Sequence, residues 1–376
     1  MTLRSSFLSP HDRRWAEVLA RIPHDIYQMP RVVEMEGRYG KDGEPVAYVV
    51  EDEGAVMLMP MYRRAIPGAR DGLHDMVGPR AFSGPVYGGP GSQSEAFMDR
   101  AAEAFRRDLR EAGCVSAYIR LHPLLSPPAE VLARHGAVVH HVDSVSVDLT
   151  LSEEQLWRQT RSNHRRDIRK AEKNGYTVHF DRQWERLDEF AEAYDQSMSR
   201  LDAEDHWRTD RNYFHDLLEA LGENGHLVVA EHDGKLAAGA IIGETGDLVD
   251  YHSAGTMTSH VSASPTKLII HFVTLWARDR GRKTLHLGST VRLDDSLMHF
   301  KLGFSPDRHP FNSWRVIADQ DAYDELVAAS TNASDAVGDE TGRDGTVGDE
   351  TGRDGTGGDG GFFPEYRRPA RDLRAH

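Results

Sequence analysis

The stretch TLHLGSTVRLDDSLMHFKLGF, residues 284–304, contains the signals of a buried strand, a polar turn and a short helix in direct succession. Alternating leucines end at Gly288, which predicts a strand that stops where the backbone approaches another group closely. Asp295 and Ser296 then offer capping oxygens ahead of an apolar turn, so a short helix is expected to carry Lys301 near its end. Sites of α/β proteins commonly lie beside strand ends. The stretch is therefore predicted to be the centre of the functional site.

Length and charge set the broad class. With 376 residues the chain is long enough for two cores, since about 100–200 residues form one domain. Asp and Glu number 60 against 45 Lys and Arg, the net charge is −15, and only seven of the basic residues are lysines. Acidic, lysine-poor surfaces retain water and cations at high salt. We therefore expect an acidic, halophilic, cytoplasmic protein that does not bind nucleic acid generally, although a local basic patch would suit a phosphate-bearing substrate.

Composition also excludes several classes. The single cysteine, Cys114, excludes an intramolecular disulfide framework and a cysteine-rich zinc site. The chain has no HExxH motif, and His140 and His141 adjoin within a strand-like run where joint metal ligation is unfavourable, so no metal is expected. No run approaches the ~18 apolar residues of a membrane span, and MTLRSSFLSPHDRRW lacks an apolar signal core. A soluble intracellular protein is expected.

The first half of the chain predicts one α/β unit. An amphipathic helix at 9–22 precedes two strands at 45–50 and 55–62, which the turn EDEG joins. A Gly- and Pro-rich stretch at 71–90 has no periodicity and predicts an ordered loop or the wall of a cleft. A strongly amphipathic helix then leads into a strand at 114–121, and a further helix and strand-like runs complete the unit.

Two tyrosines of this half are candidates for lining a site. Tyr27, in HDIYQMP, is either a core aromatic or a hydroxyl that faces a substrate. Tyr87 is the aromatic of the Gly- and Pro-rich stretch and would line the cleft if that stretch forms its wall.

A basic helix is predicted in this otherwise acidic chain. HRRDIRKAEKNG, residues 164–175, carries Arg165 and Arg166 among its cations and ends with Asn-Gly as a left-handed cap. One interpretation is a solvated helix that pairs with the acidic surface. The other is a contact for phosphate or carboxylate groups of a substrate or an RNA.

The second half repeats the element order of the first. A strand and a long helix that ends at Arg200 precede a hairpin, and VDYHSAG then supplies a strand containing Tyr251. Ser264 and Pro265 are start signals for a helix at 266–280, which leads into the strand of the opening stretch. Both halves run hairpin, helix, strand, which indicates two copies of one fold.

The C-terminal tail has a composition of its own. The decapeptide VGDETGRDGT occurs at 337–346 and again at 347–356, and one valine per copy cannot anchor a core. We therefore predict disorder over 331–361. The aromatics of FFPEYRRP are expected to dock residues 362–370 back on the body.

Several segments resemble the Fem-type (FemAB-like) transferases and their GNAT-like acetyltransferase relatives. Second-domain resemblance lies in RSNHRRDIRKAEKNGYTV, YDQSMSRL, LAAGAII, VDYHSAG, SPTKLIIHFVTLWARDRGRKTLHLG and DDSLMHFKLGF, and first-domain resemblance in HDIYQMP and MVGPRAFSGPVYGG. The resemblance covers most of residues 10–318. It implies an α/β fold of two tandem GNAT-like acyltransferase domains, each a mixed sheet flanked by helices, that share a cleft. The domains would be 1–150 and 151–318, with a tail at 319–376.

The resemblance implies transfer of an acyl or aminoacyl group to the nitrogen of an amine. Such a transfer needs a neutral amine beside a carbonyl and a positive or N–H partner for the oxyanion. Lys301 would supply the charge, and Asp295 would orient the acceptor or help its proton leave. The residues expected to bind substrate are Tyr27, Tyr87, Arg165, Arg166, Arg200 and Tyr251.

The donor implied by the resemblance is an acyl-CoA or an aminoacyl-tRNA, and the acceptor is a small-molecule or peptide amine. Acetyl-CoA enzymes of this fold bind pyrophosphate with a Q/R-x-x-G-x-G/A turn at a helix N-terminus. GTMTSHVSASPTK occupies that position here, has no glycine in 261–266, and Pro265 lacks an amide hydrogen, which argues against acetyl-CoA. A competing hypothesis is a non-catalytic GNAT-fold module that binds RNA or peptide through the basic helix at 164–173.

Overall fold

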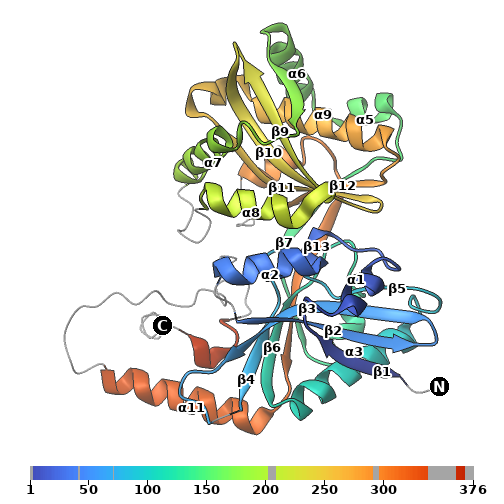
Figure 1. Cartoon of the computed structure of the whole chain (residues 1–376), viewed down its shortest axis with the longest axis vertical. Helices are drawn as coiled ribbons and strands as arrows, with labels where there is room; N and C mark the ends of the chain where they lie inside the picture. Colours follow the sequence, from blue (N-terminus) through green and yellow to red (C-terminus); the bar gives the residue numbers. More distant parts are fainter. Residues whose placement is uncertain are drawn as a thin grey trace.

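The computed structural model describes residues 3–40, 43–70, 72–201, 209–290, 296–337 and 361–368, with side chains to residue 331 in the helix that ends the fifth range. A mixed sheet of 13 strands runs through the molecule, and helices cover it in two lobes stacked along the long axis (Figure 1). The predicted class, α/β with two similar units, is confirmed, although the two expected sheets are joined into one.

The first lobe is built mainly from the N-terminal half of the chain. Its elements are β1 (Arg4–Leu8), α1 (Arg13–Leu19), η1 (Ile26–Gln28), α2 (Pro30–Gly40), β2 (Glu44–Asp52), β3 (Ala55–Ala65), β4 (His74–Val77), β5 (Val86–Gly88), α3 (Glu95–Glu111), β6 (Cys114–Arg120), α4 (Ala129–Leu132) and β7 (Ala137–Asp148). The stretch at 71–90, expected to be a loop, contains β4 and β5. These two strands escaped prediction because both are short and flanked by Gly and Pro.

The second lobe repeats this order. Its elements are α5 (Glu153–Gln159), α6 (Ser162–Lys173), β8 (Thr177–Asp181), α7 (Leu187–Arg200), α8 (Arg211–Leu221), η3 (Gly222–Asn224), β9 (Gly225–His232), β10 (Lys235–Thr245), β11 (Leu248–Thr256), η4 (Thr258–Ala263), α9 (Pro265–Asp279), β12 (Thr284–Ser289) and α10 (Ser296–Lys301). β13 (Arg308–Ile317), α11 (Gln320–Val337) and η6 (Glu365–Arg367) follow and return to the first lobe. Within the second lobe, β11 is longer than the corresponding β4 of the first.

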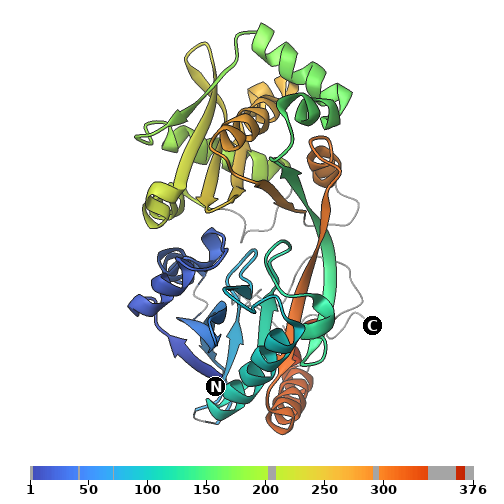
Figure 2. The same ribbon diagram turned by 90° about the vertical axis from the view of Figure 1, so that its right-hand side faces the viewer.

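The two lobes exchange one strand each. The strand order is β1-β2-β3-β4-β6-β13-β7-β12-β11-β10-β9-β8, so β13 from the C-terminal half pairs with β6, and β7 from the N-terminal half pairs with β12. Figure 2 shows both long strands passing from one lobe to the other. The predicted domain boundaries, at residues 150 and 318, divide the chain by sequence position. β13, at 308–317, lies within the second predicted domain but pairs with β6 of the first lobe.

A shared hydrophobic core also holds the lobes together. Ile26, Tyr27 and Phe82 of the first lobe pack in one cluster with Phe190 and Phe214 of the second. Burying one such side chain contributes ~1.5–3 kcal/mol. The lobe junction is therefore a packed interior, and residues of both lobes occupy fixed positions in it.

The C-terminal part covers the outer face of the first lobe. α11 runs to Val337, so the segment predicted to be disordered begins inside a helix, and residues 338–360 with the second repeat lie outside the described ranges. At 361–368 the chain packs on the first-lobe core through Phe363 and Tyr366. Arg367 donates to the fully buried carboxylate of Asp75 at 2.5 Å. Within the described residues, no helix has the length and apolar character that crossing a membrane requires.

Candidate active site

β11 and β12 diverge at the lobe junction. The two parallel strands pair only from Leu248 with Thr284 to Asp250 with His286. Beyond that point β11 continues beside β10, and β12 continues beside β7. The ends of both strands therefore lie at this divergence, which is the position where α/β proteins place their ligands.

A β-bulge lies on β11 where the divergence starts. Ile241 of β10 opposes Ser253, whereas the next residue, Ile242, opposes Tyr251, so His252 is the extra residue. A bulge bends its strand and changes the direction of nearby side chains. It lets the side chains of Asp250 and His252 meet at one atom, the Tyr27 hydroxyl, which is 2.8 Å from Asp250 Oδ2 and 3.1 Å from His252 Nδ1.

The predicted strand and helix of the opening stretch are confirmed as β12 and α10, and Lys301 ends α10, whereas residues 291–295 of the predicted turn lie outside the described residues. The Lys301 ammonium is buried and donates to Ser289 O at 2.5 Å. Gly288 has φ +74°, and a β-carbon there would lie 3.5 Å from Lys301 Nζ and 4.0 Å from Phe82 Cε2. The backbone at Gly288 thus adjoins both the cation and an aromatic ring of the first lobe, as its sequence position suggested.

A buried imidazole and carboxylate adjoin this point. His286 Nδ1 lies 3.2 Å from Asp250 Oδ1, and both side chains are fully buried. Burial raises the pKa of Asp250, but the hydrogen bond and charge of His286 outweigh it and hold that pKa below its ordinary value. The carboxylate is therefore ionised and accepts a hydrogen bond from His286 Nδ1.

A second buried pair comes from the first lobe. His122, which follows β6, lies with Nε2 3.1 Å from Asp25 Oδ2, while its Nδ1 accepts from Leu124 N–H at 3.1 Å. Nε2 therefore carries the proton and donates to Asp25. Burial, only partly offset by Asp25, lowers the pKa of His122 and keeps it neutral.

Asp25, His122 and His286 are close enough to be considered as a metal site. Their potential ligand atoms lie within 4.8 Å of one another and all three residues are buried. A ligating His122 Nε2 would have to lose its proton, and its Nδ1 would then carry one against the Leu124 N–H. This donor set fits a hydrogen-bonded cluster better than a metal centre.

The predicted arginines hold structural contacts. Arg165 donates to the carbonyls of Trp157, Arg158 and Thr160, which cap the end of α5. Arg166 is exposed and reaches only its neighbour Asp167 at 3.3 Å.

Arg200 lies at the far end of β11. It donates to Thr256 O and Thr258 Oγ1 at 2.7 Å each. Of the three predicted arginines, Arg200 alone contacts one of the diverging strands.

The predicted tyrosines separate into three environments. Tyr27 joins the two lobes through Asp250 and His252, and it is both a core aromatic and a hydroxyl at the junction. Tyr251 is half-buried against the second-lobe core, its buried hydroxyl has no partner among the described residues, and burial raises its pKa. Tyr87 packs on the first-lobe core cluster and belongs to neither of the other two environments. Asp295 lies outside the described residues.

Sequence reasoning missed Asp25, Phe82, His122, Asp250 and His286 as candidate site residues. A usable signal exists for two of them, because Asp250 and His286 interrupt strands whose neighbouring residues are apolar. The others lie in turns whose spatial neighbours come from the other lobe, so local sequence carries no signal of their role.

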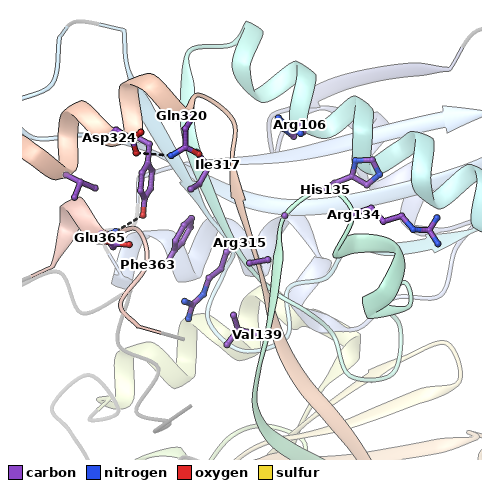
Figure 3. A pocket seen from close by; sticks show the side chains of 14 residues that line it. Arg106, Arg134, His135, Val139, Arg315, Ile317, Gln320, Asp324, Phe363 and Glu365 are labelled. Carbon is purple, nitrogen blue, oxygen red and sulfur yellow. Dashed lines mark hydrogen bonds between the residues drawn. The ribbon is translucent and has the colours of Figure 1, made fainter. Parts of the chain in front are cut away.

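A cavity of about 590 Å³ lies elsewhere, on the outer side of the first lobe (Figure 3). Residues of β7, β13, α11 and the docked C-terminal segment line it, among them Arg315 and Phe363, together with Arg134, which follows α4. Gln320 donates to Asp324 at its edge, and Glu365 N–H donates to Tyr323. None of the residues at the strand divergence borders this cavity, so we do not place the site there.

Comparison with known proteins agrees with this architecture. Residues 158–301 match the family model of the acetyltransferase (GNAT) domain. No curated protein matches the chain by sequence. The crystal structure of FemX has a TM-score of 0.66 at 13% identity, over 86% of this chain and 99% of that one. The C-terminal domain of a putative lysylphosphatidylglycerol synthetase from Agrobacterium fabrum has a TM-score of 0.52 at 16% identity, over 85% and 95%.

The L-PGS from Bacillus licheniformis is similar, with a TM-score of 0.51 at 11% identity, over 83% of this chain and 94% of that one. Residues 158–301 thus match a GNAT domain, and the chain as a whole shares the fold of FemX, in agreement with the fold that its sequence resemblance predicts. The family match covers most of the second lobe, including Asp250, His286 and Lys301.

Proposed function

We propose that this protein transfers an acyl or aminoacyl group from an activated donor to the nitrogen of an amine. The observation that carries the proposal is the divergence of β11 and β12 with a buried lysine beside the end of β12. We place the donor's carbonyl group at this divergence, where Lys301 supplies positive charge for the oxyanion. No covalent enzyme intermediate is required, since positioning and charge stabilisation suffice for attack by a neutral amine.

The exposed face of α6 in the second lobe suits a polyanionic donor. α6 packs against α9 and η4. Its exposed Lys170 and Lys173 have no ion pair among the described residues, and Arg169 stacks on Trp157. In a chain of net charge −15, this unpaired basic face favours phosphate groups. CoA and tRNA both carry such groups.

The start of α9 favours aminoacyl-tRNA over acetyl-CoA. Ser264 has φ 53°, and Pro265 occupies the first helical position without an amide hydrogen. Lys267 N–H already donates to Ser264 O at 3.0 Å, so the first turn offers few free amides to a pyrophosphate. The acceptor class under this proposal is a small-molecule or peptide amine in the cytoplasm.

A direct test incubates the full chain at multimolar KCl with acetyl-CoA or aminoacyl-tRNA and a panel of primary amines. Mass spectrometry of the products, and of metabolites from cells with and without the gene, should reveal an N-acylated species. The salt condition follows from the acidic composition. Absence of any such species with every donor would reject the proposal, and stabilisation by CoA alone would reject the tRNA version.

The unpaired basic face of α6 also favours a second candidate, a non-catalytic module that binds RNA. Under that candidate Lys301→Ala leaves RNA binding and cellular phenotype intact, whereas charge reversal of Lys170 and Lys173 abolishes both. Retained RNA binding with lost acyl transfer in Lys301→Ala would reject the non-catalytic candidate.

A further inference from the structure

Asp25 and Asp250 place two buried carboxylates at the lobe junction. Both are at most 1% exposed, and no lysine or arginine pairs with either within the described ranges. Their partners are His122, which is neutral, together with His286 and Tyr27. A buried carboxylate without a counter-charge is costly. The junction therefore favours a ligand that brings positive charge.

One polar atom at this site has no partner. His286 is 0% exposed, its Nδ1 contacts Asp250, and its Nε2 makes no hydrogen bond in the described structure. Leaving a buried acceptor unsatisfied costs ~1–3 kcal/mol. One ring nitrogen of His286 and one carboxylate oxygen of Asp25 lie within 4.8 Å of each other, so the two side chains meet at the same point of the junction.

The separation of the two side chains suits one shared tetrahedral nitrogen. Two acceptor atoms at most 4.8 Å apart can share a donor about 2.9 Å from each, with an angle at that donor of no more than about 112°. An ammonium group has this angle and two N–H bonds to give. His122 already directs its own proton at Asp25, which leaves His286 as the acceptor able to take another.

We propose that the primary ammonium group of the acceptor binds between Asp25 and His286, and that His286 removes its proton. The inference rests on the proposed function. The ammonium gives one proton to Nε2, and its freed lone pair forms the C–N bond to the donor carbonyl. Collapse breaks the carbonyl C–S or C–O bond, and the second proton leaves with the donor's sulfur or oxygen. His286 then returns its proton to solvent.

The surroundings of His286 define how the proton transfer depends on pH. The titratable and charged groups facing it are Asp250 and His252 of β11, Asp25 and Tyr27 of the first lobe, His122 after β6, His309 of β13 and Lys301 of α10.

Entry of an ammonium group requires a side chain to move, because Asp25, His122 and His286 are buried. Phe82 is that side chain, since its ring contacts His286 at a centroid distance of 4.8 Å and also lies against His122 and Gly288.

Binding is tested without knowing the substrates. In the full chain labelled with ¹⁵N-histidine, methylammonium should shift the Nε2 resonance of His286 saturably, and tetramethylammonium, which has no N–H bond, should not. Asp25→Asn should weaken the methylammonium effect at least tenfold. Asp307→Asn, an exposed carboxylate on the approach to β13, is the matched control and should not weaken it.

Proton transfer is tested in any acyl-transfer reaction that the wild type performs. His286→Gln keeps the volume but cannot accept a proton, so kcat/KM should fall 10²–10⁴-fold and lose its low-pH limb. His271→Gln, a half-buried histidine on α9, should retain both. Circular dichroism checks that each variant is folded. If His286→Gln does not fold, the binding of methylammonium to Asp25→Asn still tests the proposal.

The outcomes separate this inference from the proposed function. A protein that transfers acyl groups without a methylammonium shift, or a folded His286→Gln with wild-type rate and pH profile, overturns the inference alone. Stoichiometric Zn²⁺ shifting both His122 and His286 overturns it in favour of a metal centre. A methylammonium shift in a protein inactive with every donor supports the ammonium site and rejects the acyl transfer.

Discussion

The same strand pair is closed in the first lobe and open in the second. β4 and β6 are parallel like β11 and β12, but Gly78 N–H donates to Tyr118 O at 2.7 Å and Gly84 N–H donates to Arg120 O at 3.2 Å. The first pair therefore stays bonded to its end, whereas the second separates after Asp250 and His286.

The short helices that follow differ in the same sense. α4, AEVL, has no cation, whereas α10, SLMHFK, ends in the buried Lys301. In the first lobe Arg120, at the end of β6, donates to Gly78 O at 3.3 Å and helps to hold the strands together. The same fold therefore keeps its parallel strand pair bonded in the first lobe and separated in the second. The first lobe also contributes Asp25, Tyr27 and His122 to the junction.

The largest effect should come from the cation of the open lobe. Lys301→Ala should lower kcat 10²–10³-fold, as loss of an oxyanion partner does. Lys283→Ala, which removes an exposed lysine paired with Asp247 just before β12, should change kcat less than twofold. Steady-state kinetics of the two variants measure the difference, and equal losses would show that net charge, not position, matters.

The closed lobe should respond in stability instead. Arg367→Ala removes hydrogen bonds of 2.5 and 3.2 Å to Asp75, which keeps Arg64 as its remaining cation. Charge-assisted bonds contribute ~1.5–3 kcal/mol, so the free energy of unfolding should fall by about that amount with acyl transfer unchanged. Urea titration measures it. Arg368→Ala, the adjacent arginine without a side-chain bond in the described structure, should be neutral.

A smaller change should follow from loosening the closed strand pair. Arg120→Ala loses the bond to Gly78 O and the stacking of its guanidinium on Tyr118. We expect a loss of ~1–2 kcal/mol in unfolding free energy and no change in kcat. A fall in kcat of tenfold or more would mean that the closed lobe takes part in transfer.

Acid should affect both lobes through buried histidines. Burial, together with nearby cations, lowers the pKa of His141 in β7 and of His164 in α6 to about 4. Because the unfolded chain binds these protons first, stability should fall as pH drops from ~6.5 towards 4, by at most ~1.4 kcal/mol per unit per histidine. His164→Gln should reduce the slope for the second lobe only, as hydrogen exchange can measure. His140→Gln, half-exposed, should not change it.

The sequence predicted the parts of the site that local pattern controls. Alternating leucines, a capping serine and a closing glycine led to β12 and α10 with Lys301 at the helix end. Arg165 shows the limit of the approach, because a cation in a basic helix suggested a ligand contact, whereas its guanidinium caps α5. Its three carbonyl partners lie close in sequence, but only the fold turns them towards it.

By itself the sequence determined the element order, the duplicated α/β units and the lysine beside a strand end, because these follow from hydrophobic period and capping chemistry. Only the tertiary structure decided which strands pair. It placed β13 in the first lobe and ended the pairing of β11 and β12 at Asp250 and His286. It also brought Asp25 and His122 to His286, residues separated by up to 261 positions that no local pattern connects. Contacts of that range arise from packing the two lobes around a common junction, which is a property of the whole chain.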